Sequence, residues 1–185
     1  MPHTIEPATS GRAKCRGCGE KIAAHELRFG ESLPNPFGDG ETKYWFHLDC
    51  GAFRRPEPFL LALQAATPPL EEHERLQAQA REGITHRRLP RIDGAERSPS
   101  SRARCRCCQK SIDKGAWRIP LVFFEEGLLS PGGFVHAACS RAYFETTEIL
   151  PRIRRFAPGL GDEELRAIRA DLDRTDDDAG ARAAE

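Results

Sequence analysis

Residues 11–18 of this chain read GRAKCRGC, and residues 101–108 read SRARCRCC, at an offset of 90. The similarity continues along the chain. After one deletion, the segment WFHLDC at 45–50 aligns with FVHAAC at 134–139. Similarity that persists at a fixed offset indicates a repeated structural unit. The sequence therefore predicts a duplicated module.

Each copy of the repeat carries Cys-x2-Cys followed, after a wide gap, by His-x2-Cys. Structural zinc takes four Cys or His ligands in a tetrahedron, and a Cys-x2-Cys turn supplies two of the sulfurs without strain. Three Cys and one His close the coordination shell and leave no position for water. We expect two structural Zn²⁺ ions, one held by Cys15, Cys18, His47 and Cys50, and the other by Cys105, Cys108, His136 and Cys139.

Two alternatives keep the same residues but change their role. The cysteines could be buried thiols or an oxidation-sensitive cluster, or the ligand pairs could combine across the two copies. Each copy already has a complete ligand set at nearly the same spacing, which favours one zinc ion per copy. Cys107 aligns with Gly17 and is expected to be a thiol outside both sites.

Short apolar runs and turn residues predict the local structure of each module. Strands are expected at 26–30, 43–46, 116–122 and 134–135, with loops at 33–40 and 126–133. Trp45, Phe46, Phe134 and Val135 are expected to belong to the core. Helices are expected at 48–53, at 137–144, as two pieces within 56–82, and at 163–172, with a basic amphipathic stretch at 149–156 and a linker at 83–101.

The fold class that follows is a pair of small α+β zinc-stabilised modules. Each is a Cys3His finger with a short antiparallel sheet and a helix, and further helices link the modules and end the chain. The domains are a first finger at 9–66, a helix and flexible linker at 67–98, a second finger at 99–160, and a helix with an acidic disordered tail at 161–185. Zinc would supply stability that so small a core lacks.

Charge is unevenly distributed, although the 28 basic and 28 acidic residues cancel. Residues 102–161 carry 10 basic and 5 acidic side chains, whereas residues 162–185 carry 4 and 9. No apolar run is long enough to span a bilayer, and no export signal is evident at the N-terminus. We expect a cytoplasmic protein (nucleoid-associated if bacterial) or a nuclear one, in which cysteines bind metal.

The motif SGRAKCRGCGEKI at 10–22, together with Trp45-Phe46-His47, resembles the poly(ADP-ribose) polymerase-type zinc finger. A second, more diverged copy resembles it from 101 to 139. The similarity covers about residues 9–60 and 99–146. The resemblance implies sequence-independent recognition of DNA strand breaks, whether nicks, gaps or ends, with nicked duplex favoured.

The resemblance also implies which residues contact DNA. In this family an Arg three residues before the first Cys and an Arg ten residues after the second bind the phosphate backbone, and apolar loop residues stack on exposed base pairs. The matching positions are Arg12, Arg28 and Phe37 in the first copy and Arg102, Arg118, Leu128 and Leu129 in the second. Each has an ordinary alternative, since an Arg can be a solvated charge and Phe37 can fold onto its own module.

No catalytic motif is visible, and both predicted metal sites are closed, so we expect no enzymatic activity. The expected partner is broken DNA, with a repair protein as a possible second partner, no membrane, and a monomeric state. The main alternative is a zinc-stabilised protein-interaction adaptor that presents its helices. Salt dependence separates the two, because phosphate contacts weaken steeply as salt rises. A third hypothesis for the function is a redox sensor that uses Cys107.

Overall fold

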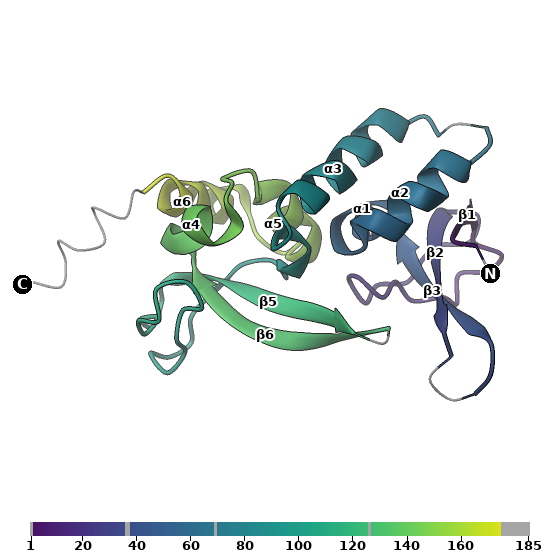
Figure 1. Ribbon diagram of the computed structural model, residues 1–185. Helices are drawn as coiled ribbons and strands as arrows, with labels where there is room; N and C mark the ends of the chain where they lie inside the picture. Colours follow the sequence, from purple (N-terminus) through teal and green to yellow (C-terminus); the bar gives the residue numbers. More distant parts are fainter. Residues whose placement is uncertain (1, 36–37, 69, 126, 175–185) are drawn as a thin grey trace, which may run out of the picture. The chain divides into compact units, whose positions relative to one another are not determined.

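The computed structural model describes residues 2–35, 38–68, 70–125 and 127–174 of the 185-residue chain. The chain forms two compact units, one of Met1–Pro90 with Phe124–Ser130 and the other of Arg91–Phe123 with Pro131–Glu185 (Figure 1). The zinc-ligand motif of the first copy of the repeat lies in the first unit and that of the second copy in the second unit.

The first unit is built on an antiparallel sheet of order β1-β2-β3, with β1 at Thr4–Pro7, β2 at Leu27–Pro34 and β3 at Glu41–His47. Its register places Phe29 opposite Phe46, and both rings are fully buried. Side chains alternate between the two faces of a strand. One face of this sheet is therefore the core face, and the next residue pair, Gly30 and Trp45, lies on the other face.

Three helices follow the sheet of the first unit. They are α1 at Leu48–Arg54, α2 at Pro56–Ala65 and α3 at His73–Thr85 (Figure 1). Helices α1 and α2 pack against the core face of the sheet, and α3 packs against α1 and α2. The ring of Phe59 in α2 meets the ring of Phe29 edge-on, with centroids 5.3 Å apart. The amphipathic face of α2 thus completes an aromatic core over the sheet.

The second copy of the repeat, most of which forms the second unit, has the same order of elements. Its sheet is β4-β5-β6, with β4 at Glu96–Arg97, β5 at Trp117–Glu125 and β6 at Leu128–His136. Short 3-10 turns at Leu89–Arg91 and Ala137–Cys139 precede its first strand and first helix. The helices are α4 at Ser140–Phe144, α5 at Leu150–Phe156 and α6 at Asp162–Leu172.

The predicted helices are present with small shifts at their ends. The two pieces expected within 56–82 are α2 and α3, and α6 begins one residue earlier than expected, where the Gly161 amide donates to Glu164 at 3.0 Å. Among the described residues, no helix combines the length and the apolar character that crossing a bilayer requires. The acidic stretch after residue 174 lies outside the described residues.

The segment at 83–101, expected as a flexible linker, contains a strand and buried side chains in its second half. Glu96 and Arg97 form β4, which pairs with β5, and Ile92 and Ala95 are buried. The burial of these two apolar side chains and the pairing of β4 with β5 offset part of the conformational entropy that ordering the segment costs. The second module therefore has a first strand equivalent to β1.

The loop expected at 126–133 is also different, because most of it is strand β6. Gly132 and Gly133 had suggested a turn. A Cβ at Gly132 would instead lie 2.6 Å from the ring of Phe123 on the neighbouring strand. Gly132 thus provides space for a cross-strand aromatic ring, a use of glycine that is difficult to distinguish from a turn in sequence.

We predict that Gly51→Ala destabilises the first unit, although alanine favours helix by about 1 kcal/mol relative to glycine. A Cβ at Gly51 would lie 2.8 Å from the Phe29 ring and 2.9 Å from the Phe59 ring. Overpacking of this kind costs about 1–3 kcal/mol. Urea denaturation followed by circular dichroism would measure the change.

Gly11→Ala is the matched control in the same unit, because its Cβ would meet only ordinary contacts at 3.6 Å and beyond. Its stability should change by less than about 0.5 kcal/mol. Equal losses in the two variants would contradict the packing argument.

Candidate metal centres and nucleic-acid interface

The first group of metal ligands is assembled from three pieces of the chain. Cys15 and Cys18 lie on a turn closed by the bridge between Lys14 and Lys21, His47 ends β3, and Cys50 lies in α1. Their ligand atoms lie within 4.8 Å of one another, and those of the equivalent residues of the second unit do so too: Cys105, Cys108, His136 and Cys139. The structure therefore brings together both ligand sets predicted from the repeat.

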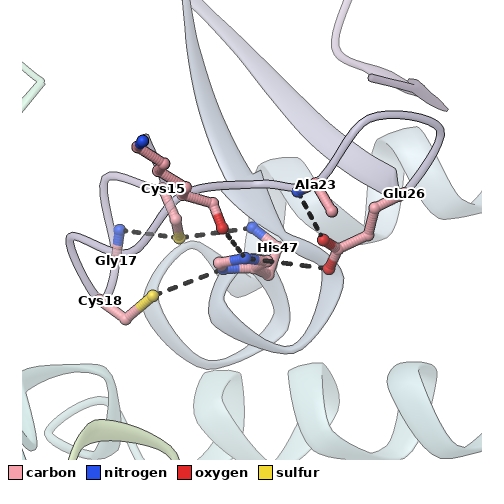
Figure 2. A network of polar contacts seen from close by, with 7 residues as sticks. Cys15, Gly17, Cys18, Ala23, Glu26 and His47 are labelled. Atoms are coloured by element: carbon pink, nitrogen blue, oxygen red, sulfur yellow. Dashed lines mark hydrogen bonds and ion pairs between the residues drawn. The ribbon is translucent and has the colours of Figure 1, made fainter. Parts of the chain in front are cut away.

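Backbone amides point at one sulfur in each group. The amides of Gly17 and His47 donate to Sγ of Cys15 at 3.3 and 3.4 Å (Figure 2). In the second group the amides of Cys107 and His136 donate to Cys105 in the same way, at 3.4 and 3.3 Å. Such bonds offset the negative charge of a thiolate and orient it as a ligand.

The two histidines have the same orientation. Nδ1 of His47 faces Sγ of Cys18 at 3.4 Å, while Nε2 lies 3.3 Å from the carbonyl oxygen of Lys21 and 3.8 Å from the carboxylate of Glu26 (Figure 2). His136 directs Nδ1 toward Cys108 at 3.5 Å and Nε2 toward the Ser111 carbonyl at 3.2 Å. In both histidines Nε2 thus faces a backbone carbonyl, to which its N–H can donate, and Nδ1 faces the sulfurs.

These distances fit zinc. A tetrahedral ion with a Zn–S bond of about 2.3 Å and a Zn–N bond of about 2.0 Å requires the nitrogen and the sulfur to be roughly 3.5 Å apart. The observed N–S distances of 3.4 to 3.7 Å agree with that edge. Three sulfurs and one imidazole nitrogen are also the donor set of structural zinc sites.

The pKa values show how the ligands share protons among themselves. The pKa of the Cys18 thiol is well below its usual range because the thiols of Cys15 and Cys50 donate hydrogen bonds to it. Hydrogen bonds with Cys15 and Cys18 raise the pKa of His47 to about 10. In the second group, a bond from a neighbouring thiol lowers the pKa of Cys105 to about 3. Each group therefore stabilises a thiolate beside donors, and a divalent cation would extend this stabilisation to all three sulfurs.

The chain accordingly binds two structural zinc ions, one in each Cys3His group. Cys107 is not among the ligands of the second group, and its amide donates to Sγ of Cys105.

The predicted DNA-contacting arginines occupy two kinds of position. Arg12 and Arg102, on the segments before the first cysteines, are exposed. Arg28 and Arg118 are only 7% and 8% exposed. Arg28 lies on the sheet face opposite the core, where its guanidinium stacks 3.5 Å from the centre of the Trp45 ring and donates to Glu6 at 3.1 Å.

The stacking depends on a glycine. Gly30 lies opposite Trp45 in the register, and a Cβ there would come within 2.6 Å of the indole. The ring can therefore lie flat across β2 and form a platform for Arg28. Trp45 and Phe134, expected in the core, are half-exposed and stack on arginine instead, whereas Phe46 and Val135 are buried as expected.

Arg118 repeats the arrangement in the second unit. Its guanidinium lies 3.7 Å from the centre of the Phe134 ring and donates from Nε and Nη2 to Glu96, at 2.9 and 2.5 Å. The carboxylates of Glu6 and Glu96 were not identified from the sequence. They are related by the offset of 90, so extending the repeat toward the N-terminus of each copy could have found them.

The predicted stacking residues differ in what the structure shows of them. Leu128 begins β6 and is 60% exposed, and Leu129 beside it is half-buried. Phe37 lies outside the described residues. The large exposed side chain of Leu128 is thus placed at the end of a hairpin and not within the core.

Comparison with known proteins bears on the first unit. Residues 6–87 match the family described as "Poly(ADP-ribose) polymerase and DNA-Ligase Zn-finger region". The first module is a zinc finger of this type. The match runs from the middle of β1 to just past α3, so the sheet, the zinc ligands and all three helices of the first unit belong to it.

Similar proteins are poly(ADP-ribose) polymerases. Poly [ADP-ribose] polymerase 1 of Gallus gallus is 30% identical over 133 residues, which are 64% of this chain and 13% of the relative. The protein of the same name from Caenorhabditis elegans is 42% identical over 50 residues, 27% of this chain and 5% of the relative. Poly [ADP-ribose] polymerase of Drosophila melanogaster is 28% identical over 134 residues, which are 64% of this chain and 13% of the relative. The chain thus spans a small part of these relatives.

We predict that Cys50→Ser leaves one zinc ion per chain, whereas the unmodified protein carries two. Loss of one thiolate opens a structural site whose binding energy is about 10–16 kcal/mol and is coupled to folding. Native mass spectrometry would count the ions directly.

Cys107→Ser is the matched control, because Cys107 also lies in this protein's cysteine motifs but is not a ligand. It should retain two ions. A single ion in this variant would mean that Cys107 takes part in coordination.

Proposed function

We propose that the protein binds DNA strand breaks without reading sequence, using two zinc fingers, and catalyses no reaction on them. The observation that carries this proposal is the match of residues 6–87 to the zinc-finger region of poly(ADP-ribose) polymerases and DNA ligases. The duplicated zinc site in the second unit supports a second finger of similar construction.

Arginine supplies the sequence-independent part of this binding. Arg12 and Arg102 are exposed next to the Cys-x2-Cys turns, and Arg28 shares the non-core face of the first sheet with Trp45. Contacts to phosphate oxygens position a protein on DNA but carry no sequence information. Affinity that depends on such contacts falls steeply with salt, because counterions are released on binding.

An exposed apolar side chain supplies the selectivity for a break. Leu128 is large, apolar and 60% exposed at the end of the β5–β6 hairpin. A nick exposes the face of a base pair that intact duplex keeps stacked, and covering such a face contributes about 1–3 kcal/mol per base in related complexes. Phe37 is the corresponding proposal in the first finger.

Two fingers on one chain can increase affinity through effective concentration once one of them is bound. We expect a monomer that acts in a compartment containing DNA, with a repair protein as a possible partner. An adaptor that binds proteins through its helices is the alternative function, and the first experiment separates it from DNA binding.

We predict that the protein binds nicked duplex at least about tenfold more tightly than the same duplex intact, if one base-stacking contact distinguishes them. Fluorescence anisotropy with a labelled nicked duplex and unlabelled competitors would measure the ratio. Zinc chelation should abolish the preference. Equal affinity for both duplexes would contradict break recognition, and no binding at moderate salt would favour the adaptor.

We also predict that Leu128→Ser lowers affinity for nicked duplex by about tenfold, with little change for intact duplex. Leu61→Ser is the matched control, since Leu61 in α2 is also 60% exposed. The control should bind both duplexes as the unmodified protein does. Equal effects of the two substitutions would show that Leu128 has no special role.

A further inference from the structure

Residues 8 and 98 are equivalent positions in the two modules. The Ala8 amide donates to the Glu26 carbonyl and its own carbonyl accepts from His25; the Ser98 amide and carbonyl bond in the same way with Ala116 and Gly115. Each pair of positions differs by 90. The backbone geometry is thus the same, but the first module has a methyl group where the second has a hydroxyl.

That hydroxyl completes a set of bonds around Arg118. Nε and Nη2 donate to Glu96, and Nη1 donates to Oγ of Ser98 at 3.3 Å. Ser98 is buried and donates its own proton to the Ser100 carbonyl at 2.8 Å, which leaves its lone pairs for the arginine. Every nitrogen of the Arg118 guanidinium therefore donates a hydrogen bond within its own module.

Arg28 has fewer partners at the equivalent position. In the described part of the chain, Nη2 donates to Glu6 at 3.1 Å, while Nε is buried and has no acceptor. Ala8 has no side-chain oxygen that could accept from Nη1, unlike Ser98 at the equivalent position. A buried guanidinium with unmet donors is costly unless a ligand supplies acceptors, and phosphate oxygens match the planar fork of arginine.

We propose that the two modules are unequal in phosphate binding, and that residue 8 or 98 decides the difference. Arg28 retains donors for a backbone phosphate, whereas Ser98 and Glu96 hold Arg118 as an internal structural group. The inference rests on the proposed function and narrows it. Of the two deeply placed arginines, only that of the first finger contacts DNA.

The test compares Arg28→Ala with Arg118→Ala on nicked and on intact duplex over a range of salt concentrations. A lost phosphate contact lowers the slope of log affinity against log salt by about 1, whereas a purely structural loss leaves the slope unchanged. We expect the smaller slope, and about tenfold weaker binding, for Arg28→Ala only. Zinc content and thermal melting verify that each variant is folded.

A pair of milder substitutions tests residue 8 and residue 98 directly and removes no charge. Ala8→Ser should weaken binding about threefold by giving Arg28 an internal acceptor, and Ser98→Ala should strengthen it by a similar factor by releasing Nη1 of Arg118. No change in either variant would overturn the assignment of this position as the determinant.

The outcomes distinguish this inference from the proposed function. Selective binding to nicks with equal slope changes in both arginine variants would overturn the inference and leave break recognition in place. Equal binding to nicked and intact duplex would overturn break recognition, while the two slopes on intact duplex would still decide which arginine meets phosphate. Absence of DNA binding would overturn both.

Discussion

Tetrahedral coordination by three thiolates and one imidazole is the constraint on which each module depends. Its ligands come from a turn, from the last residue of a strand and from the helical segment that follows, which is α1 in the first module and the 3-10 turn before α4 in the second. One ion thus ties together elements that a small core alone would hold weakly. In the first module the same ion fixes where β3 ends, at His47, and where α1 begins. The sheet and the helices then enclose the aromatic core around Phe29.

Besides the zinc site, both modules share an arrangement of side chains on the face of the sheet opposite the core. An arginine stacks on an aromatic ring of the last strand and pairs with a carboxylate of the first strand. Stacking over an aromatic face contributes up to about 2 kcal/mol when the cation is desolvated, and the carboxylate compensates for lost hydration. The arrangement holds the guanidinium in one orientation, and a planar guanidinium held in this way can bind two oxygens of one anionic group at once.

The two modules share this arrangement although the surrounding residues differ. Trp45 corresponds to Phe134, Gly30 corresponds to Pro120, and Ala8 corresponds to Ser98. None of these differences disturbs the zinc ligands or the order of strands. They change how many hydrogen-bond donors of the guanidinium have an acceptor within the module. Two modules with the same order of elements can therefore differ in what they bind.

Both zinc sites could be predicted from the amino-acid sequence, because ligand type and spacing are local and occur twice. Most strands and helices could be predicted too, from the pattern of apolar residues. Only the tertiary structure decided which side of each sheet a residue faces and what it meets there. Arg28 and Arg118 read alike in sequence, yet their hydrogen bonds depend on a first strand that lies about twenty residues earlier in the chain and pairs with theirs. Gly132, which makes room for Phe123, likewise resembles a turn residue in the sequence until the neighbouring strand is in place.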